Sequence, residues 1–212
     1  MSLTLYFLRH GETTFSQSGS YCGFIDPDLT AEGDRMAQEF AFSYQKIPLQ
    51  AIYVSPMKRT IATAQPLCDL VGIDMQLRNG LKELNYGAWE GKTPEYVKEN
   101  YLDDYIKWMN EPAWNSPTKG ERAIEVANRA VSIISEIEST YTEGNVLVVS
   151  HKGTIRVMLC SLLGIDLGCY RNRIDMPVAA ISVVKFGVHG PMLQKLGDRS
   201  HLSEELRDRI GT

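Results

Sequence analysis

Short apolar runs alternate with amphipathic stretches along most of the chain. Three of these runs have the pattern of buried strands, at residues 3–8, 51–54 and 145–149. Weaker strands are expected at Met75–Leu77 and at residues 181–186, with residues 192–196 as a partner of the latter. Strands that alternate with helices predict an α/β fold with three layers, α/β/α, in which helices cover both faces of a mostly parallel sheet.

Helical periodicity fills the intervals between these strands. Thr30 is the expected N-cap of a helix that ends near Tyr44, and a second helix is expected to end near Val71. Further helices are predicted over residues 94–109, 118–140 and 152–163. No repeat, low-complexity tract or linker interrupts the pattern, so we expect a single domain over residues 1–212.

The interval from about residue 79 to residue 117 is irregular and aromatic. It contains all three tryptophans of the chain, Trp89, Trp108 and Trp114, together with four tyrosines. We predict that this interval is a helical cap inserted over one edge of the sheet. A subsidiary aromatic core would explain the same composition.

Charge and cysteine usage exclude several classes of protein. A net charge of -4 disfavours a nucleic-acid or anionic membrane surface, and no apolar run approaches the length of a membrane span. The first residues lead directly into a strand without a basic segment, so no signal peptide is expected. Four widely spaced cysteines without a C-x-x-C pair suggest reduced thiols and a cytoplasmic protein.

Polar clusters follow three of the predicted strands at the point where each strand ends. Arg9-His10-Gly11, residues 55–59 and Ser150-His151 would share one edge of a parallel sheet, where ligands bind. Two of only four histidines lie there, and an arginine beside a buried strand end is costly unless it meets an anion. This edge is therefore the expected site of a phosphate or carboxylate ligand.

Five sequence blocks around these clusters resemble, in order, the motifs of the histidine phosphatase superfamily, in the branch named for cofactor-dependent phosphoglycerate mutase. The resemblance spans residues 3 to about 164 and adds little beyond. The blocks are Leu8-Arg9-His10-Gly11-Glu12-Thr13, Gly23-x-x-Asp26-x-x-Leu29-Thr30-x-x-Gly33, Ser55-Pro56-Met57-Lys58-Arg59-Thr60-x-x-Thr63-Ala64, Leu81-x-Glu83-x-x-Tyr86-Gly87-x-Trp89-Glu90-Gly91 and Val148-Val149-Ser150-His151-x-Gly153-x-x-Arg156.

The resemblance implies a phosphohistidine mechanism without metal or other cofactor. His10 would attack phosphorus as the neutral imidazole, with its other ring nitrogen held by a backbone carbonyl. Arg9, Arg59 and His151 would surround the phosphoryl oxygens, and Glu83 would be the general acid. The expected substrate-binding residues are Ser16, Cys22, Gly23, Tyr86, Lys152 and Gly153. Ser16 stands where many members have asparagine, and its contact with the substrate is therefore expected to be weakened or altered. Cys22-Gly23 stands where they often have Thr-Gly, and there the contact with the substrate is expected to come from backbone N–H groups.

Within this family the sequence favours a phosphatase over a phosphoglycerate mutase. The mutases carry arginine and histidine directly after the catalytic glutamate, whereas here Leu84 and Asn85 follow Glu83. The expected substrate is a small phosphomonoester such as phosphoserine, α-ribazole phosphate or a sugar phosphate. A mutase and a non-catalytic protein that binds phospho-ligands remain the alternatives.

A hydrophobic stripe near the C-terminus leaves the oligomeric state open. Leu202, Leu206 and Ile210 have helical spacing, with acidic residues before and basic residues after them. The stripe would pack either on its own domain or on a partner subunit, and a homodimer is one alternative.

Overall fold

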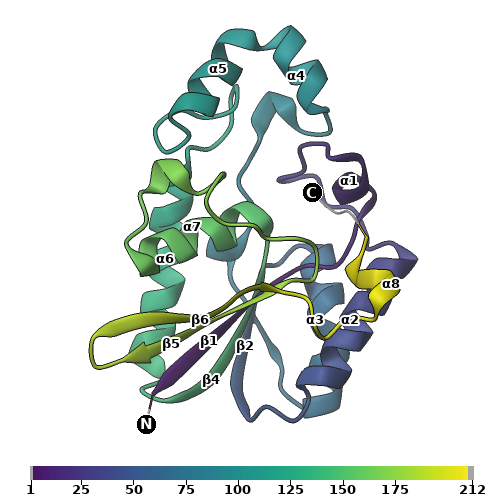
Figure 1. Cartoon of the computed structure of the whole chain (residues 1–212), viewed down its shortest axis with the longest axis vertical. Coiled ribbons are helices and arrows are strands. Elements are labelled where there is room, and N and C mark those ends of the chain that lie inside the picture. Colours follow the sequence, from purple (N-terminus) through teal and green to yellow (C-terminus); the bar gives the residue numbers. More distant parts are fainter. Residues whose placement is uncertain (1, 210–212) are drawn as a thin grey trace.

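The computed structural model describes residues 2–209, and across them the chain forms one mixed sheet of six strands (Figure 1). The strand order is β3-β2-β4-β1-β5-β6. The first four strands in this order run parallel, whereas β5 and β6 form an antiparallel hairpin beside β1. The bounds are β1 (Leu3–Arg9), β2 (Leu49–Val54), β3 (Met75–Leu77), β4 (Gly144–Ser150), β5 (Ile181–Gly187) and β6 (Gly190–Asp198).

Helices cover both faces of this sheet, as the sequence predicted. Helices α2 and α3 pack on one face, and α6 and α7 pack on the other (Figure 1). The helices of the described residues are α1 (Thr14–Ser18), α2 (Ala31–Tyr44), α3 (Lys58–Val71), α4 (Pro94–Asn100), α5 (Leu102–Asn110), α6 (Ala123–Thr140), α7 (Lys152–Leu163) and α8 (Glu204–Arg207). Short 3-10 turns are η1 (Asn79–Leu81), η2 (Gly87–Trp89) and η3 (Leu167–Cys169).

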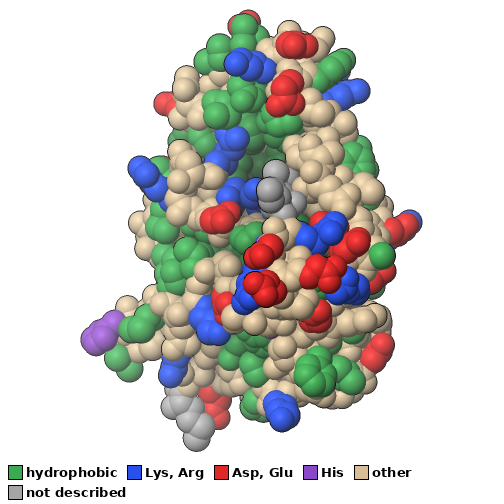
Figure 2. Space-filling model, turned by 45° about the vertical axis from the view of Figure 1, so that its right-hand side comes forward, with side chains coloured by type: hydrophobic (Ala, Val, Ile, Leu, Met, Phe, Trp, Pro, Cys, Tyr) green, Lys and Arg blue, Asp and Glu red, His purple; other side chains and the backbone are tan. Residues whose placement is uncertain are grey.

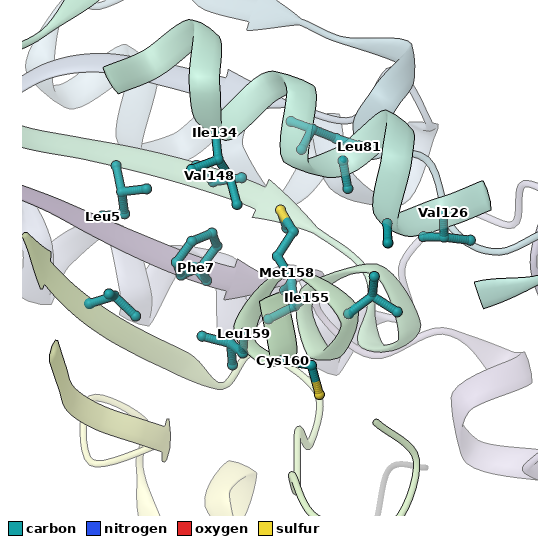
Figure 3. Close-up of a cluster of buried hydrophobic side chains, with 14 of the residues drawn as sticks. Leu5, Phe7, Leu81, Val126, Ile134, Val148, Ile155, Met158, Leu159 and Cys160 are labelled. Carbon is teal, nitrogen blue, oxygen red and sulfur yellow. The ribbon is translucent and has the colours of Figure 1, made fainter. Parts of the chain in front are cut away.

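Alternating side chains of the central strands build the two cores. Phe7 and Val148 pack against α6 and α7, while their neighbours Leu8 and Val149 pack against α2 and α3. Figure 3 shows the first core, where Phe7 of β1 lies beside Met158 and Leu159 of α7. Burial on both faces explains why these strands are continuous apolar runs.

Two helix predictions were wrong in their bounds. The helix expected over residues 94–109 is split at Tyr101, whose backbone (φ −137°, ψ 38°) leaves the helical region even though its N–H still donates to the Val97 carbonyl (2.8 Å). The helix expected from residue 118 begins at Ala123, because Gly120 and Glu121 instead pack against Asn85, with Glu121 N–H donating to its carbonyl (2.8 Å). Thr30 is the N-cap of α2, as predicted.

Helices α4 and α5 extend beyond the sheet on the side where β1 and β4 end (Figure 1). Together with η2 they build a separate aromatic cluster, in which Trp89 of η2 and Trp108 of α5 are buried with their rings nearly perpendicular. Tyr21 and Tyr86 pack against the same pair. The segment therefore has a small core of its own, and its role as a cap over the site remains a proposal.

The C-terminal stripe packs on its own chain. Leu202 and Leu206 are buried against Met36, Val178 and Ala179, whereas Ile210 lies outside the described residues. Helix α8 is a single turn, shorter than the stripe suggested.

Within residues 2–209, none of the helices has both the length and the apolar character that crossing a membrane requires.

Candidate active site

The carboxyl ends of three parallel strands bring the polar clusters together. Arg9 at the end of β1 lies opposite Ser150 at the end of β4, and His10 N–H donates to the Ser150 carbonyl (3.1 Å). Ser55, which follows β2, donates its N–H to the carbonyl of Val149 (3.0 Å). Segments about 140 residues apart in the chain thus meet at one edge, as the sequence predicted.

His10 is held in one tautomer. Its Nδ1 lies 2.7 Å from the carbonyl oxygen of Gly11, which can only accept, so Nδ1 carries the proton and Nε2 keeps its lone pair. This confirms the predicted backbone contact. Burial, followed by the charges of Arg59 and Arg9, lowers the pKa of His10 well below its ordinary value. The ring is therefore neutral near pH 7, as a nitrogen nucleophile requires.

Arg59, in the first turn of α3, is almost fully buried and held from several sides. Its guanidinium donates to the carbonyls of Gly23 and Ile25 (both 2.8 Å), and it lies 3.4 Å from the carboxylate of Asp26. Gly23, predicted to bind substrate, does not line the pocket but positions this arginine. A backbone N–H group at Cys22-Gly23 was expected to contact the substrate, but the N–H of Gly23 already donates to the carboxylate of Glu90 (3.0 Å).

His151 is completely buried behind His10, with the two ring centroids 5.3 Å apart. Its Nδ1 accepts from Arg59 Nε (3.2 Å), so Nε2 carries the proton and donates to Ser55 Oγ (2.8 Å). Burial and then Arg59 lower the pKa of His151 well below its ordinary value. In this structure His151 contacts the other site residues and does not line the pocket.

Glu83 lies against the first turn of α7. Its Oε1 accepts from the N–H groups of Leu84 (2.8 Å) and Thr154 (3.1 Å), and its Oε2 accepts from Gly153 N–H (3.0 Å). Gly153 is required for this approach, since a Cβ there would lie 2.7 Å from Glu83 Oε1. The helix N-terminus thus orients the carboxyl group, which lines the same pocket as His10.

A pocket of about 170 Å³ joins these residues. Nine of its lining residues were not among the predicted binding or catalytic set. Of the predicted residues, those that line it are Arg9, His10, Ser16, Cys22, Arg59, Glu83, Tyr86, Lys152 and Gly153. The structure therefore collects nearly all of the predicted residues around one opening.

Ser16 and Cys22, which differ from the residues that family members often have at these positions, both lie at the pocket. The hydroxyl of Ser16 accepts from Thr13 N–H and donates to Thr13 carbonyl (both 2.8 Å), which closes the N-terminus of α1. Cys22 is partly buried, and burial raises the pKa of its thiol to about 11. This thiol is therefore protonated near pH 7.

Sequence reasoning did not assign several residues that form the outer wall of the pocket. Arg156 follows Lys152 by four positions on α7, a spacing that places both on one helix face and could have indicated its position. No local pattern marks the others, which come together only through packing. They include Tyr21, Trp108, Tyr170 and Arg171.

A histidine, two arginines and a carboxylic acid around a small pocket at a sheet edge are typical of an enzyme that handles phosphoryl groups. The family model described as histidine phosphatase superfamily (branch 1) matches residues 5–199, and the chain belongs to this superfamily. The match extends beyond residue 165, where the motifs alone added little.

Proteins similar to this chain include several phosphatases. Phosphoserine phosphatase 1 of Hydrogenobacter thermophilus is 32% identical over 200 residues, covering 94% of each chain. Adenosylcobalamin/alpha-ribazole phosphatase of Escherichia coli is 26% identical over 178 residues, 79% of this chain and 88% of that protein. A mutant phosphoserine phosphatase of Entamoeba histolytica, solved in complex with phosphoserine, is 25% identical with a TM-score of 0.84, covering 95% of this chain and 100% of the other.

Proposed function

We propose that this protein is a phosphatase that hydrolyses small phosphomonoesters through a phosphohistidine at His10. The observation that carries the proposal is the single tautomer of His10, whose lone pair is on Nε2. The same pocket contains Arg9 and Arg59, whose positive charges suit the phosphoryl oxygens, and Glu83 as a proton donor. Because these side chains supply the charge and the proton, the reaction is expected to need no metal or other cofactor.

In the first step, Nε2 of His10 attacks phosphorus and the P–O bond to the alcohol breaks. The electron pair of that bond goes to the leaving oxygen, which takes a proton from Glu83. In the second step, Glu83 as the carboxylate takes a proton from water, whose oxygen attacks phosphorus. The P–N bond then breaks, its electrons return to the imidazole, and inorganic phosphate leaves.

Hydrolysis is favoured over the mutase alternative by the residues that follow Glu83. Leu84 is buried, and Asn85 uses its side-chain oxygen to accept from Gly87 N–H (2.8 Å), so neither offers a cation to a phosphoglycerate. Release of phosphate from 3-phosphoglycerate should exceed its interconversion with 2-phosphoglycerate. Faster interconversion would overturn this choice.

Trapping of the covalent intermediate tests the proposal directly. After brief exposure to a 32P-labelled ester, an alkaline quench should retain label on the protein and an acid quench should release it, since phosphohistidine is acid-labile. His10→Ala should retain no label, and activity should survive EDTA. Alkali-stable label on the His10→Ala variant would contradict the assignment, and so would activity lost to EDTA and restored by magnesium.

We further propose that residues 79–117 act as a cap over this site within a single domain, and that the enzyme works in the cytoplasm. Free thiols at all four cysteines support a reducing compartment. A homodimer remains a prediction, which light scattering coupled to size-exclusion chromatography would test.

A further inference from the structure

We infer that the pocket contains a second anion subsite, formed by Lys152, Arg156 and Arg171, and that the substrate carries a carboxylate besides its phosphoryl group. This inference rests on the proposed phosphatase function and narrows its substrate class. It assigns a task to basic residues that the phosphoryl chemistry does not use.

The first argument is the excess of positive charge. Five basic side chains line the pocket, and among its described lining residues Glu83 is the single carboxylate. Arg9 and Arg59 line the pocket together with His10, and two cations match the two negative charges of a phosphomonoester. Three further basic side chains remain, and even with Glu83 ionised a phosphomonoester of a neutral alcohol would leave positive charge in excess.

The second argument is the poor neutralisation of the cations on α7. Burial, followed by the charges of Arg9 and Arg156, lowers the pKa of Lys152 to about 7. The nearest carboxylate of Arg156 is that of Asp175, 3.9 Å away on a side chain that is 90% exposed. Arg156 Nε is also buried without a hydrogen-bond partner among residues 2–209. An anion bound beside these groups would stabilise both of them.

The third argument is the placement of Arg171 across the opening. It follows η3 on the body of the molecule, and its guanidinium lies over the ring of Trp108, 3.5 Å from the ring centroid. Its Nη1 lies 2.9 Å from Met109 Sδ, and it forms no ion pair with any described residue. The stacking fixes the plane of the guanidinium, which retains donors for a carboxylate. Figure 2 shows Lys and Arg side chains at the boundary between the α4–α5 region and the rest of the molecule.

The size of the pocket limits the rest of the substrate. A volume of about 170 Å³, with Tyr21, Tyr86 and Tyr170 in the wall, suits a carbon skeleton of a few atoms. Both anionic groups must therefore lie close together on the substrate. A phosphorylated small hydroxy or amino acid meets these conditions.

Matched substrate pairs test the subsite. O-phosphoserine and O-phosphoethanolamine share a primary alkoxide leaving group and differ by one carboxylate, as do 3-phosphoglycerate and 2-hydroxyethyl phosphate. We expect the wild-type enzyme to prefer the carboxylated member of each pair by about 10-fold or more in kcat/KM, because hydrogen bonds between charged groups are strong.

In the variants Arg156→Gln and Arg171→Gln, kcat/KM should fall about 10-fold or more for the carboxylated substrate of each pair. For the substrate without the carboxylate it should fall by less than about 3-fold. Arg156→Lys should retain part of the preference, which separates lost charge from misfolding. Arg173→Gln is the matched control, because Arg173 is exposed and outside the pocket. It should behave as wild type.

Two results would overturn the inference and leave the proposed function intact. One is an equal loss of kcat/KM on both substrates of a pair in the Arg156→Gln and Arg171→Gln variants. The other is a wild-type enzyme with equal kcat/KM for both substrates of a pair. In either case p-nitrophenyl phosphate would still be hydrolysed through His10. Failure of the proposed function would look different, because no ester, p-nitrophenyl phosphate included, would label His10 or release phosphate.

Discussion

His10, Arg59 and Glu83 are each oriented by backbone atoms. The Gly11 carbonyl fixes the tautomer of His10, the Gly23 and Ile25 carbonyls hold Arg59, and N–H groups of α7 orient Glu83. Backbone groups of a packed fold move little, so the site is organised before substrate arrives. Such preorganisation is what electrostatic stabilisation of a transition state needs.

The role of Glu83 as an acid can be separated from a role in binding by changing the leaving group. An alkoxide must be protonated as the P–O bond breaks, whereas p-nitrophenolate leaves without a proton. Glu83→Gln should therefore slow the burst phase with an alkyl phosphate by about 10²–10⁴-fold, and the burst with p-nitrophenyl phosphate far less. Single-turnover rates are the measurement, since in the proposed mechanism Glu83 also serves the later hydrolysis.

Glu99→Gln is the control for this experiment, because Glu99 is exposed on α4. It should change neither burst. Equal losses with both substrates for Glu83→Gln would mean that the carboxyl group positions the phosphate and does not donate the proton.

At the scale of elements, the N-terminus of α7 connects the two halves of the pocket. Within its first five residues the helix places Lys152 and Arg156 in the pocket wall and holds Glu83 through Gly153 and Thr154. A shift of this one turn would disturb both the acid and the proposed anion subsite.

Gly153→Ala should displace Glu83 without unfolding the helix. The added Cβ would lie 2.7 Å from Glu83 Oε1, so the carboxyl group must move and its bond to Gly153 N–H must lengthen. Misplacement of a catalytic group by about 1 Å can cost about 10²-fold in rate, so we expect kcat/KM for an alkyl phosphate to fall about 10- to 100-fold. The melting temperature should change little, because alanine favours a helix.

Ser161→Ala, on the same helix and outside the pocket, is the control for this substitution. It should leave kcat/KM unchanged. Full activity in Gly153→Ala, with a normal melting temperature, would show that the close approach of α7 to Glu83 is not needed.

At the scale of the molecule, the C-terminal segment is joined to the loop that follows His10. Arg209 donates to both carboxylate oxygens of Glu12 (2.9 and 3.0 Å), whose side chain is 1% exposed. Arg199 donates to the carbonyls of Leu206 and Arg207 (both 2.7 Å) and so holds the same segment. Burial opposes ionisation of Glu12, but hydrogen bonds from Arg209 and Thr30 outweigh it and lower the pKa of this carboxyl group.

Arg209→Gln should therefore destabilise the protein in a pH-dependent way. A lowered carboxyl pKa contributes stability that is fully present above the ordinary value of 4.5 and is lost as pH falls through the folded-state pKa. We expect a loss of about 1 kcal/mol at pH 7, or about 2–4 °C in melting temperature, that shrinks below about pH 4. Thermal unfolding by circular dichroism across this range is the measurement.

Arg207→Gln, an exposed neighbour on the same segment, is the control and should melt as the wild type at every pH. An equal loss in both variants, or a loss in Arg209→Gln that persists at low pH, would mean that the ion pair with Glu12 does not stabilise the fold.

The sequence by itself determined the α/β architecture, most of the element bounds and the set of polar residues that meets around His10. These features are local, because alternation along a strand, an N-cap such as Thr30 and polar residues directly after a strand all lie within a few positions of one another. Parallel pairing then brings Arg9 beside Ser150 without further information. The motifs added the predicted role of Glu83 as general acid, which no periodicity would have marked.

Only the tertiary structure placed Arg171 over Trp108 and Arg209 on Glu12. Their partners lie 63 and 197 residues away along the chain. No short-range pattern specifies such pairs, because they depend on how the α4–α5 region and the C-terminal segment pack on the body. The late start of α6 has the same cause, since the loop contact from Glu121 N–H to the Asn85 carbonyl replaces the helical hydrogen bonds that local periodicity predicted.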